Sequence, residues 1–244
     1  MKIKFIPSPN FTEKKRRIIR YVIIHYTGMK TAQASIQRLK SKKHKVSSHY
    51  LIDNSGKIVQ MVKDKDIAWH SGVSYWDGKI NLNNNSIGIE LQNKGHEFGY
   101  ENFRTSQISS LINLVSLIKL RYNICDAFIL GHSDIAPDRK IDPGYLFPWH
   151  QLYNGDIGLM PNIKSIDNKE IPTSGIKKLQ LLLREFGYKL TISEVLDKET
   201  LQVLYAFQSH YCPAELKQFK IKRKLVVYLK ALIKAKNRSL TKKK

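Results

Sequence analysis

Short runs of aliphatic and β-branched residues, each followed by a polar side chain, recur through the first two thirds of the chain. Tyr21-Val22-Ile23-Ile24 is too short for a helix and leads directly into His25. Residues 86–91 and 127–130 have the same character. The pattern predicts buried strands with polar groups at their ends, where functional sites are often built.

A hairpin and two helices complete this first region. Residues 50–52 and 57–62 flank Asp53-Asn54-Ser55-Gly56, which has the composition of a tight turn. Residues 31–42 predict a short basic helix, and a longer helix begins at Thr105 or Ser106. Its apolar face is formed by Ile108, Leu111, Ile112, Val115 and Ile118. Strands mixed with a few helices predict an α/β (α+β) fold, with a central mixed β-sheet flanked by helices.

The mixed pattern of strands and helices ends at about Gly158, and from about Thr173 onward the chain is expected to be helical. Helical patterns occupy residues 176–186, 198–211 and 223–236, and their apolar residues predict a small three-helix domain. Pro161, Asn162 and Pro172 mark the joint. The expected domains are therefore residues 1–159, a linker over 160–172, and a helical C-terminal domain over 173–244.

Composition excludes few functions. With 244 residues, 42% hydrophobic and 25% charged, the chain has the composition of a folded globular protein. Its formal charge of +22 attracts polyanions in general, whether nucleic acid, anionic lipid or the carboxylates of a bacterial wall. We find neither a nucleic-acid-binding motif nor aromatics interleaved in a basic stripe, so no nucleic-acid partner is expected. No apolar run is long enough for a transmembrane segment, and no secretory signal is evident at the start.

Three residues stand out as metal ligands among the eight histidines and the acidic residues. His25 and His132 each close a strand, and Asp142 lies ten residues after His132 in a loop bounded by Pro137 and Pro143. Two neutral imidazoles and one carboxylate form a catalytic zinc set, because three protein ligands leave a fourth tetrahedral position for water. Spacing alone does not decide the set, and His49, His70 and His150 remain rival ligands.

Five strings in this region carry a family resemblance. They are Ile24-His25-Tyr26-Thr27, Val46-Ser47-Ser48-His49-Tyr50, Ala68-Trp69-His70, Leu82-Asn83 with Ser86-Ile87-Gly88-Ile89-Glu90, and Gly131-His132-Ser133-Asp134-Ile135-Ala136-Pro137 through Lys140-Ile141-Asp142-Pro143-Gly144. With these strings in this order, the chain resembles the zinc-dependent N-acetylmuramoyl-L-alanine amidases of the phage-lysozyme type, most closely the AmiD branch of the AmpD/AmiD group. The resemblance implies one zinc ion per chain, held by His25, His132 and Asp142. It also implies hydrolysis of the amide bond between the lactyl group of N-acetylmuramic acid and the L-alanine of the peptidoglycan stem peptide.

The resemblance places Glu90 and Lys140 beside the metal as catalytic groups. Glu90 ends a strand and can act as general base toward the attacking water, then return the proton to the departing amine. Lys140 precedes Asp142 by two residues, so in an extended segment both side chains point the same way while Ile141 points back. Without the family strings, Glu90 reads as a strand-edge carboxylate and Lys140 as a solvated charge.

A cleft for sugar and peptide needs aromatic and amide groups in its walls. Tyr26, Trp69, His70 and Asn83 are the expected substrate-binding residues, because aromatic faces suit sugar rings and an amide suits backbone-like hydrogen bonds. Trp69 also fits a place in the core. The expected partners are peptidoglycan or muropeptides.

The C-terminal region has a resemblance of its own. Residues 176–180 with Phe186-Gly187-Tyr188, then Asp197-Lys198-Glu199-Thr200 and Ala206-Phe207-Gln208, are similar to the three-helix peptidoglycan-binding domain. The same apolar ladder serves any small helical bundle, so wall binding and bracing of the catalytic domain both remain open.

The alternative function is a non-catalytic peptidoglycan recognition protein of the same fold, but such relatives typically lose a metal ligand and this chain keeps all three. The substrate class favours the periplasm or cell envelope, whereas the missing export signal favours the cytoplasm, and we expect the periplasm. The sequence does not determine the oligomeric state; a monomer is favoured.

Overall fold

The structure is a computed structural model that describes residues 2–161, 163, 169–217 and 222–241. Its centre is a six-stranded sheet in the order β1, β5, β4, β9, β3, β10. The strands are β1 (Ile3–Phe5), β5 (Ile58–Gln60), β4 (Tyr50–Ile52), β9 (Ser86–Leu91), β3 (Tyr21–Tyr26) and β10 (Ile129–Gly131). All neighbours are parallel except β4 and β5, which form the predicted hairpin. The mixed sheet expected from the sequence is confirmed.

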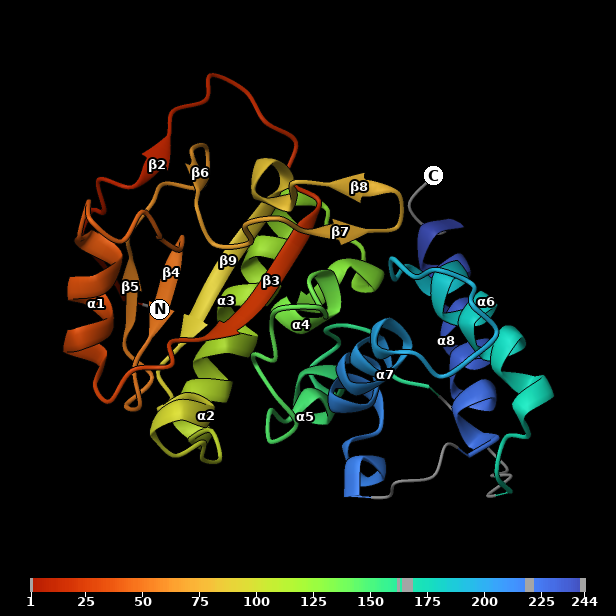
Figure 1. Cartoon of the computed structure of the whole chain (residues 1–244). Coiled ribbons are helices and arrows are strands. Elements are labelled where there is room, and N and C mark those ends of the chain that lie inside the picture. Colours follow the sequence, from red (N-terminus) through yellow and green to blue (C-terminus); the bar gives the residue numbers. More distant parts are fainter. Residues whose placement is uncertain (1, 162, 164–168, 218–221, 242–244) are drawn as a thin grey trace.

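The two faces of the central strand β3 are covered by different parts of the chain. Val22 and Ile24 pack into a core with helix α3 (Thr105–Tyr122), while Tyr21 and Ile23 join a second core. Successive residues of a strand point to opposite faces, which is why one apolar run serves both cores. In Figure 1, α3 lies across one face of the sheet, behind β9 and β3. A strand buried on both faces explains the unbroken aliphatic run at Val22-Ile23-Ile24.

The second core consists largely of residues from the C-terminal helices α6 (Ile176–Phe186), α7 (Lys198–Tyr211) and α8 (Lys224–Thr241). These helices occupy the three predicted segments, and α8 continues five residues beyond the predicted end. Figure 1 shows them grouped beside α4 (His132–Ile135). The helical region is therefore packed against the sheet domain through a continuous apolar interface.

Trp76 lies at the centre of that interface. Its indole is fully buried, with its ring centroid 4.9 Å from that of Tyr188 and 5.7 Å from that of Phe186. A Cβ atom on Gly187 would lie 2.7 Å from the Trp76 ring, so only glycine permits this close approach.

The domain boundaries predicted from the sequence stay a prediction, and most of the expected linker, including Asn162, lies outside the described residues.

The remaining α-helices and strands are short. They are α1 (Ala32–Lys40), α2 (Gly95–Phe98), α5 (Trp149–Asn154), β2 (Phe11–Thr12), β6 (Ile67–Ala68), β7 (Tyr75–Trp76) and β8 (Lys79–Ile80). Thr31 caps α1 by accepting a hydrogen bond from the backbone N–H of Ala34. The strand predicted at 127–130 begins only at Ile129, because a 3-10 turn occupies Asp126–Phe128. In the described part of the chain, no helix combines the length and the apolar character needed to cross a membrane.

Candidate metal centre and active site

Three parallel strands bring the candidate catalytic residues to one edge of the sheet. His25 in β3 is the register partner of Glu90 in β9. On the other side of β3, Gly131 pairs with Ile24, so His132 follows at the level of His25. Parallel strands present their carboxyl ends at the same edge, which is where open α/β sheets build their sites. The fold therefore collects in space three residues that are far apart in sequence.

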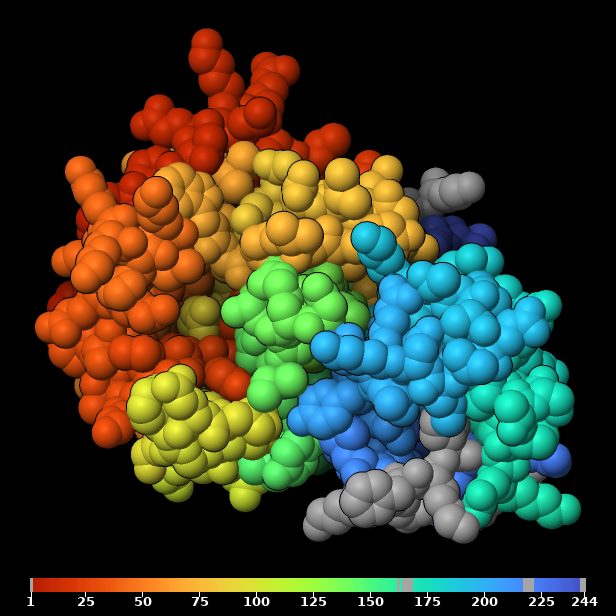
Figure 2. Space-filling view, in the orientation of Figure 1, coloured from red at the N-terminus to blue at the C-terminus, as the bar shows by residue number. Residues whose placement is uncertain are grey.

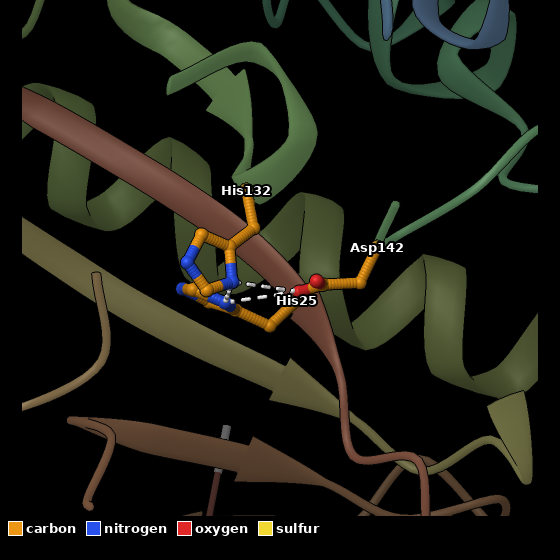
Figure 3. Close-up of side chains that lie close together, drawn as sticks. All are labelled: His25, His132 and Asp142. Atoms are coloured by element: carbon orange, nitrogen blue, oxygen red, sulfur yellow. Dashed lines mark hydrogen bonds and ion pairs between the residues drawn. The ribbon is translucent and has the colours of Figure 1, made fainter. Parts of the chain in front are cut away.

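Asp142 completes a compact triangle with the two histidines. The Nδ1 atoms of His25 and His132 lie 2.9 Å apart, and Asp142 Oδ2 lies 3.2 Å from the former and 3.1 Å from the latter. In Figure 3 the three side chains point toward one another from β3, from the start of α4 and from the loop after α4. Ser133 N–H donates to Asp142 O over 2.8 Å and so ties this loop to α4.

The triangle fits a tetrahedral metal ion. Ligand atoms at about 2.0–2.2 Å from a tetrahedral zinc stand roughly 3.3–3.6 Å apart. The three observed separations are within a few tenths of an ångström of this range. Among the described residues, this is the one group of His, Cys, Asp and Glu side chains found to be close enough to hold a metal. The predicted ligand set is thus brought together by the fold, and the donor set suits zinc.

The rival histidines are engaged elsewhere. His49 Nδ1 accepts from Gly88 N–H, and His49 Nε2 lies 3.1 Å from Asp66 O, so both ring nitrogens are taken by the backbone. His150 is exposed on α5, away from the triangle. His70 is buried behind His25 and contacts it without joining the ligand atoms.

The environment favours the protonation states that ligands need. Burial lowers the pKa of His25 to about 4, and the neighbouring His132 adds to the effect. Burial by itself raises the pKa of Asp142, but His132 and His25 outweigh it and hold that pKa below its usual range. A neutral imidazole and an ionised carboxylate are the forms that bind a metal.

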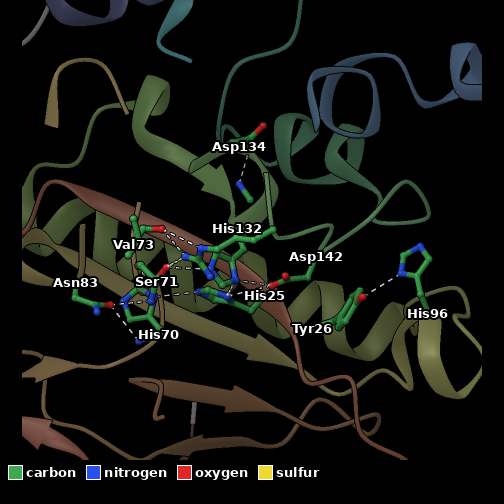
Figure 4. Close-up of polar contacts among 12 residues, drawn as sticks. His25, Tyr26, His70, Ser71, Val73, Asn83, His96, His132, Asp134 and Asp142 are labelled. Carbon is green, nitrogen blue, oxygen red and sulfur yellow. Dashed lines mark hydrogen bonds and ion pairs between the residues drawn. The ribbon is translucent and has the colours of Figure 1, made fainter. Parts of the chain in front are cut away.

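Both imidazoles are held from behind by their second nitrogen. His132 Nε2 donates to Ser71 O over 3.2 Å, and Arg139 also donates to this carbonyl. His25 Nε2 lies 3.0 Å from His70 Nδ1, and His70 Nε2 in turn lies 3.1 Å from Ser86 Oγ. Figure 4 shows His70 and Ser71 beside the two imidazoles, on the side away from Asp142. Such partners fix the tautomer and the ring orientation of a metal-bound histidine.

All three residues of the triangle line a cavity of about 610 Å³. Its walls come from the end of β3, from α1, from α2 and from the loop that follows α4. Figure 2 shows the hollow between the orange segment around α1 and the green segment around α4. The space is adequate for part of a sugar–peptide chain.

Glu90 and Lys140 both line this cavity. Glu90 Oε2 is buried, and among the described residues it has no hydrogen-bond partner. Burial raises the pKa of Glu90 well above its usual range, and the nearby Asp142 contributes. Lys140 follows a turn, and its N–H bonds Ala136 O. Ile141 lines the cavity as well, so the expected alternation of side chains along residues 140–142 stays a prediction.

The four expected substrate-binding residues have different positions. Tyr26 and Trp69 line the cavity, Tyr26 with its hydroxyl 2.9 Å from His96 Nδ1 and Trp69 with its indole N–H bonded to Thr12 Oγ1. His70 reaches the cavity only from behind His25. Asn83 is absent from the lining, and its Oδ1 accepts the backbone N–H groups of His70 and Ser71. Their roles in substrate binding stay predictions.

Sequence reasoning missed the groups that support the ligands. Ser71, Arg139 and Asp134 act through hydrogen bonds, and no spacing or composition marks them. Only their place inside or beside the family strings hinted at importance.

Comparison with known proteins agrees with this geometry. The sequence model of the family described as N-acetylmuramoyl-L-alanine amidase matches residues 14–145. N-acetylmuramoyl-L-alanine amidase AmiD of Escherichia coli K12 is 36% identical over 213 residues, covering 80% of this chain and 75% of the relative. The 1,6-anhydro-N-acetylmuramyl-L-alanine amidase AmpD of Haemophilus influenzae is 34% identical over 165 residues, covering 60% of this chain and 88% of the relative.

A solved structure matches nearly the whole chain. It is the complex of Escherichia coli AmiD with the substrate anhydro-N-acetylmuramic acid-L-Ala-D-gamma-Glu-L-Lys. The TM-score is 0.79 at 31% identity, and the match covers 93% of this chain and 98% of the other. The similarity therefore includes the C-terminal helices as well as the sheet domain.

Proposed function

The chain belongs to the N-acetylmuramoyl-L-alanine amidase family, and we propose that it carries out the family's reaction with one zinc ion held by His25, His132 and Asp142. The reaction is hydrolysis of the amide bond between the lactyl group of N-acetylmuramic acid and the L-alanine of the stem peptide, in cell-wall turnover and recycling. The observation that supports the zinc site is the triangle of ligand atoms, with sides of 2.9, 3.1 and 3.2 Å, in the lining of the cavity. Zinc, when bound, supplies Lewis acidity that makes hydroxide available near neutral pH and polarises the scissile carbonyl.

We assign the general base to Glu90. Its Oε2 atom is free of other hydrogen bonds among the described residues and belongs to a cavity wall, beside the ligand His25. The carboxylate takes a proton from the attacking water and returns it to the nitrogen of L-alanine as the C–N bond breaks. A carboxyl group with a raised pKa suits both halves of this transfer.

Lys140 is assigned to the oxyanion. Its side chain lines the same cavity, and its ammonium acts on both His25 and Glu90 electrostatically. A fixed positive charge next to the reacting carbonyl stabilises the negative charge that develops on its oxygen. Glu90 therefore transfers the proton, and Lys140 stabilises the negative charge on the carbonyl oxygen.

The substrate is proposed to be a muropeptide, either free or within peptidoglycan. AmiD of Escherichia coli was solved with an anhydromuramoyl peptide, and the Haemophilus influenzae relative is named for a 1,6-anhydro substrate. Tyr26 and Trp69 offer aromatic faces in the cavity wall for a sugar ring.

We place the protein in the periplasm or cell envelope, on the basis of this substrate class. Cell fractionation against a cytoplasmic marker tests the location, and co-purification with that marker would contradict it.

The zinc site is tested by measurements on the purified full chain. We expect about one zinc per chain by elemental analysis, and release of free stem peptide from muropeptides by mass spectrometry. Chelation should abolish the release, and added zinc should restore it. Undiminished turnover by metal-free protein, or by His132→Ala, would rule out the zinc mechanism.

A further inference from the structure

The carboxylate of Asp134 is buried two residues after the ligand His132, and its hydrogen bonds connect the metal centre to the C-terminal helices. Its side chain has no exposed surface. Asp134 Oδ2 accepts the backbone N–H of Gly131, the residue before His132, over 2.7 Å. The carboxylate thus closes the first turn of α4, the four-residue helix that begins at His132. Its position governs how the backbone presents the ligand.

Two further donors to Asp134 come from the C-terminal region. Tyr188 Oη donates to Asp134 Oδ1 over 2.6 Å, and His210 Nδ1 donates to Oδ2 over 2.7 Å. A buried carboxylate is costly unless donors surround it. Since two of the three donors described for Asp134 lie beyond residue 173, the sheet domain alone leaves this group largely unsatisfied.

Both donors are held rigidly. The His210 ring is stacked between Trp149, at a centroid distance of 3.6 Å, and Tyr211, at 3.8 Å. Tyr188 is fully buried, with its ring at the edge of Trp76. Figure 4 shows Asp134 on the side of α4 away from the ligand triangle, facing the blue helices of the C-terminal region. The network therefore approaches His132 from behind, through its backbone.

We propose that Tyr188 and His210 are positioning residues for His132, acting through Asp134, so that the C-terminal helices complete the metal site of the sheet domain. This inference rests on the zinc site proposed above. Loss of either donor leaves the carboxylate short of a partner, and Asp134 then turns toward other donors or water. The Gly131 N–H is released and His132 shifts. A metal site tolerates displacements of only about 0.5 Å in its ligands.

A second contact between the two regions provides a matched control. Lys236 Nζ on α8 donates to Asp77 Oδ1 over 2.8 Å and to Phe186 O over 2.9 Å, so it also joins the helices to the sheet domain. None of the hydrogen bonds described for Lys236 reaches α4. Lys236→Met therefore weakens the attachment of the helices without touching Asp134.

The test measures zinc affinity of the full chain by competition with a chromogenic chelator, together with the thermal unfolding temperature. We expect Tyr188→Phe and His210→Ala to lower the affinity about tenfold, the lower end of the range for groups that orient metal ligands. His210→Gln, which keeps a donor, should recover part of the loss, and Lys236→Met should leave affinity within twofold of the parent even where it lowers the unfolding temperature equally.

Affinities unchanged by Tyr188→Phe and His210→Ala, or lowered as much by Lys236→Met, would overturn the inference. Should His210→Ala fail to fold, Tyr188→Phe decides alone, since it removes a single oxygen. The parent protein separates the two claims. If the parent binds no zinc the metal site itself fails, whereas tight binding by parent and variants alike refutes only the positioning role.

Discussion

His25 and Glu90 are register partners on the neighbouring parallel strands β3 and β9, 65 positions apart in sequence. Partners at one level of a parallel sheet have side chains on the same side, so the metal ligand and the proposed general base share the cavity. The pairing fixes Glu90 beside the metal centre through backbone hydrogen bonds rather than through a flexible loop. The site therefore depends on strand register.

Replacement of Glu90 by glutamine should abolish proton transfer while sparing the fold. The amide has the same shape and removes a buried charge, so we expect zinc content to be unchanged and the unfolding temperature to be equal or higher. General acid–base groups contribute about 10²–10⁴ in rate, and kcat should fall by that factor. A variant that retained more than a tenth of the parent kcat would exclude Glu90 as the base.

Replacement of Lys140 separates charge from size. Lys140→Met keeps the length of the side chain and should lower kcat by about 10²–10³, the cost of removing one oxyanion donor. KM for a soluble muropeptide should change much less, because the interaction forms mainly in the transition state. Lys140→Arg keeps the positive charge, so its kcat should lie between that of the parent and that of Lys140→Met. Equal kcat in the parent and the methionine variant would contradict the assignment.

Zinc should also stabilise the fold, since its three ligands come from separate elements. With free zinc at 100 times Kd, the gain in the free energy of unfolding is about 2.7 kcal/mol. We expect the unfolding temperature of chelator-treated protein to rise on titration with zinc, and the rise to vanish in His132→Ala. An equal rise in that variant would place the metal elsewhere.

The sheet and the ligand set could be predicted because their signals are local. The run Tyr21-Val22-Ile23-Ile24 marks its strand through β-branched residues, and His25 follows it directly. The link from Asp134 to His210 spans 76 positions and exists only because the C-terminal helices cover the second face of β3. The hydrophobic pattern of a helix shows which face is buried, but not which other element that face packs against. Strands β1, β2, β6, β7 and β8 have two or three residues each and escaped prediction, whereas β4 and β5 were marked by the turn between them.

Gly88 in β9 has no side chain, and the His70 ring occupies the space that a side chain there would need. A Cβ atom there would lie 2.4 Å from Cγ of His70, whose backbone N–H is held by Asn83 and whose ring contacts His25 Nε2. The ring must therefore move and release His25. Overpacking of this kind costs about 1–3 kcal/mol, and we expect Gly88→Ala to lower both the free energy of unfolding and zinc affinity.

A double-mutant cycle provides the control for this prediction. His70→Ala removes all three ring atoms that the new methyl group would meet, so Gly88→Ala should cost much less in that background than in the parent. The single variant His70→Ala loses the contact to His25 and should itself lower zinc affinity. Strictly additive free energies of unfolding would show that the strain lies elsewhere than between Gly88 and His70. Coupling of at least about 0.5 kcal/mol, measured by denaturant unfolding, would confirm that β9 needs glycine here so that His70 can support the ligand.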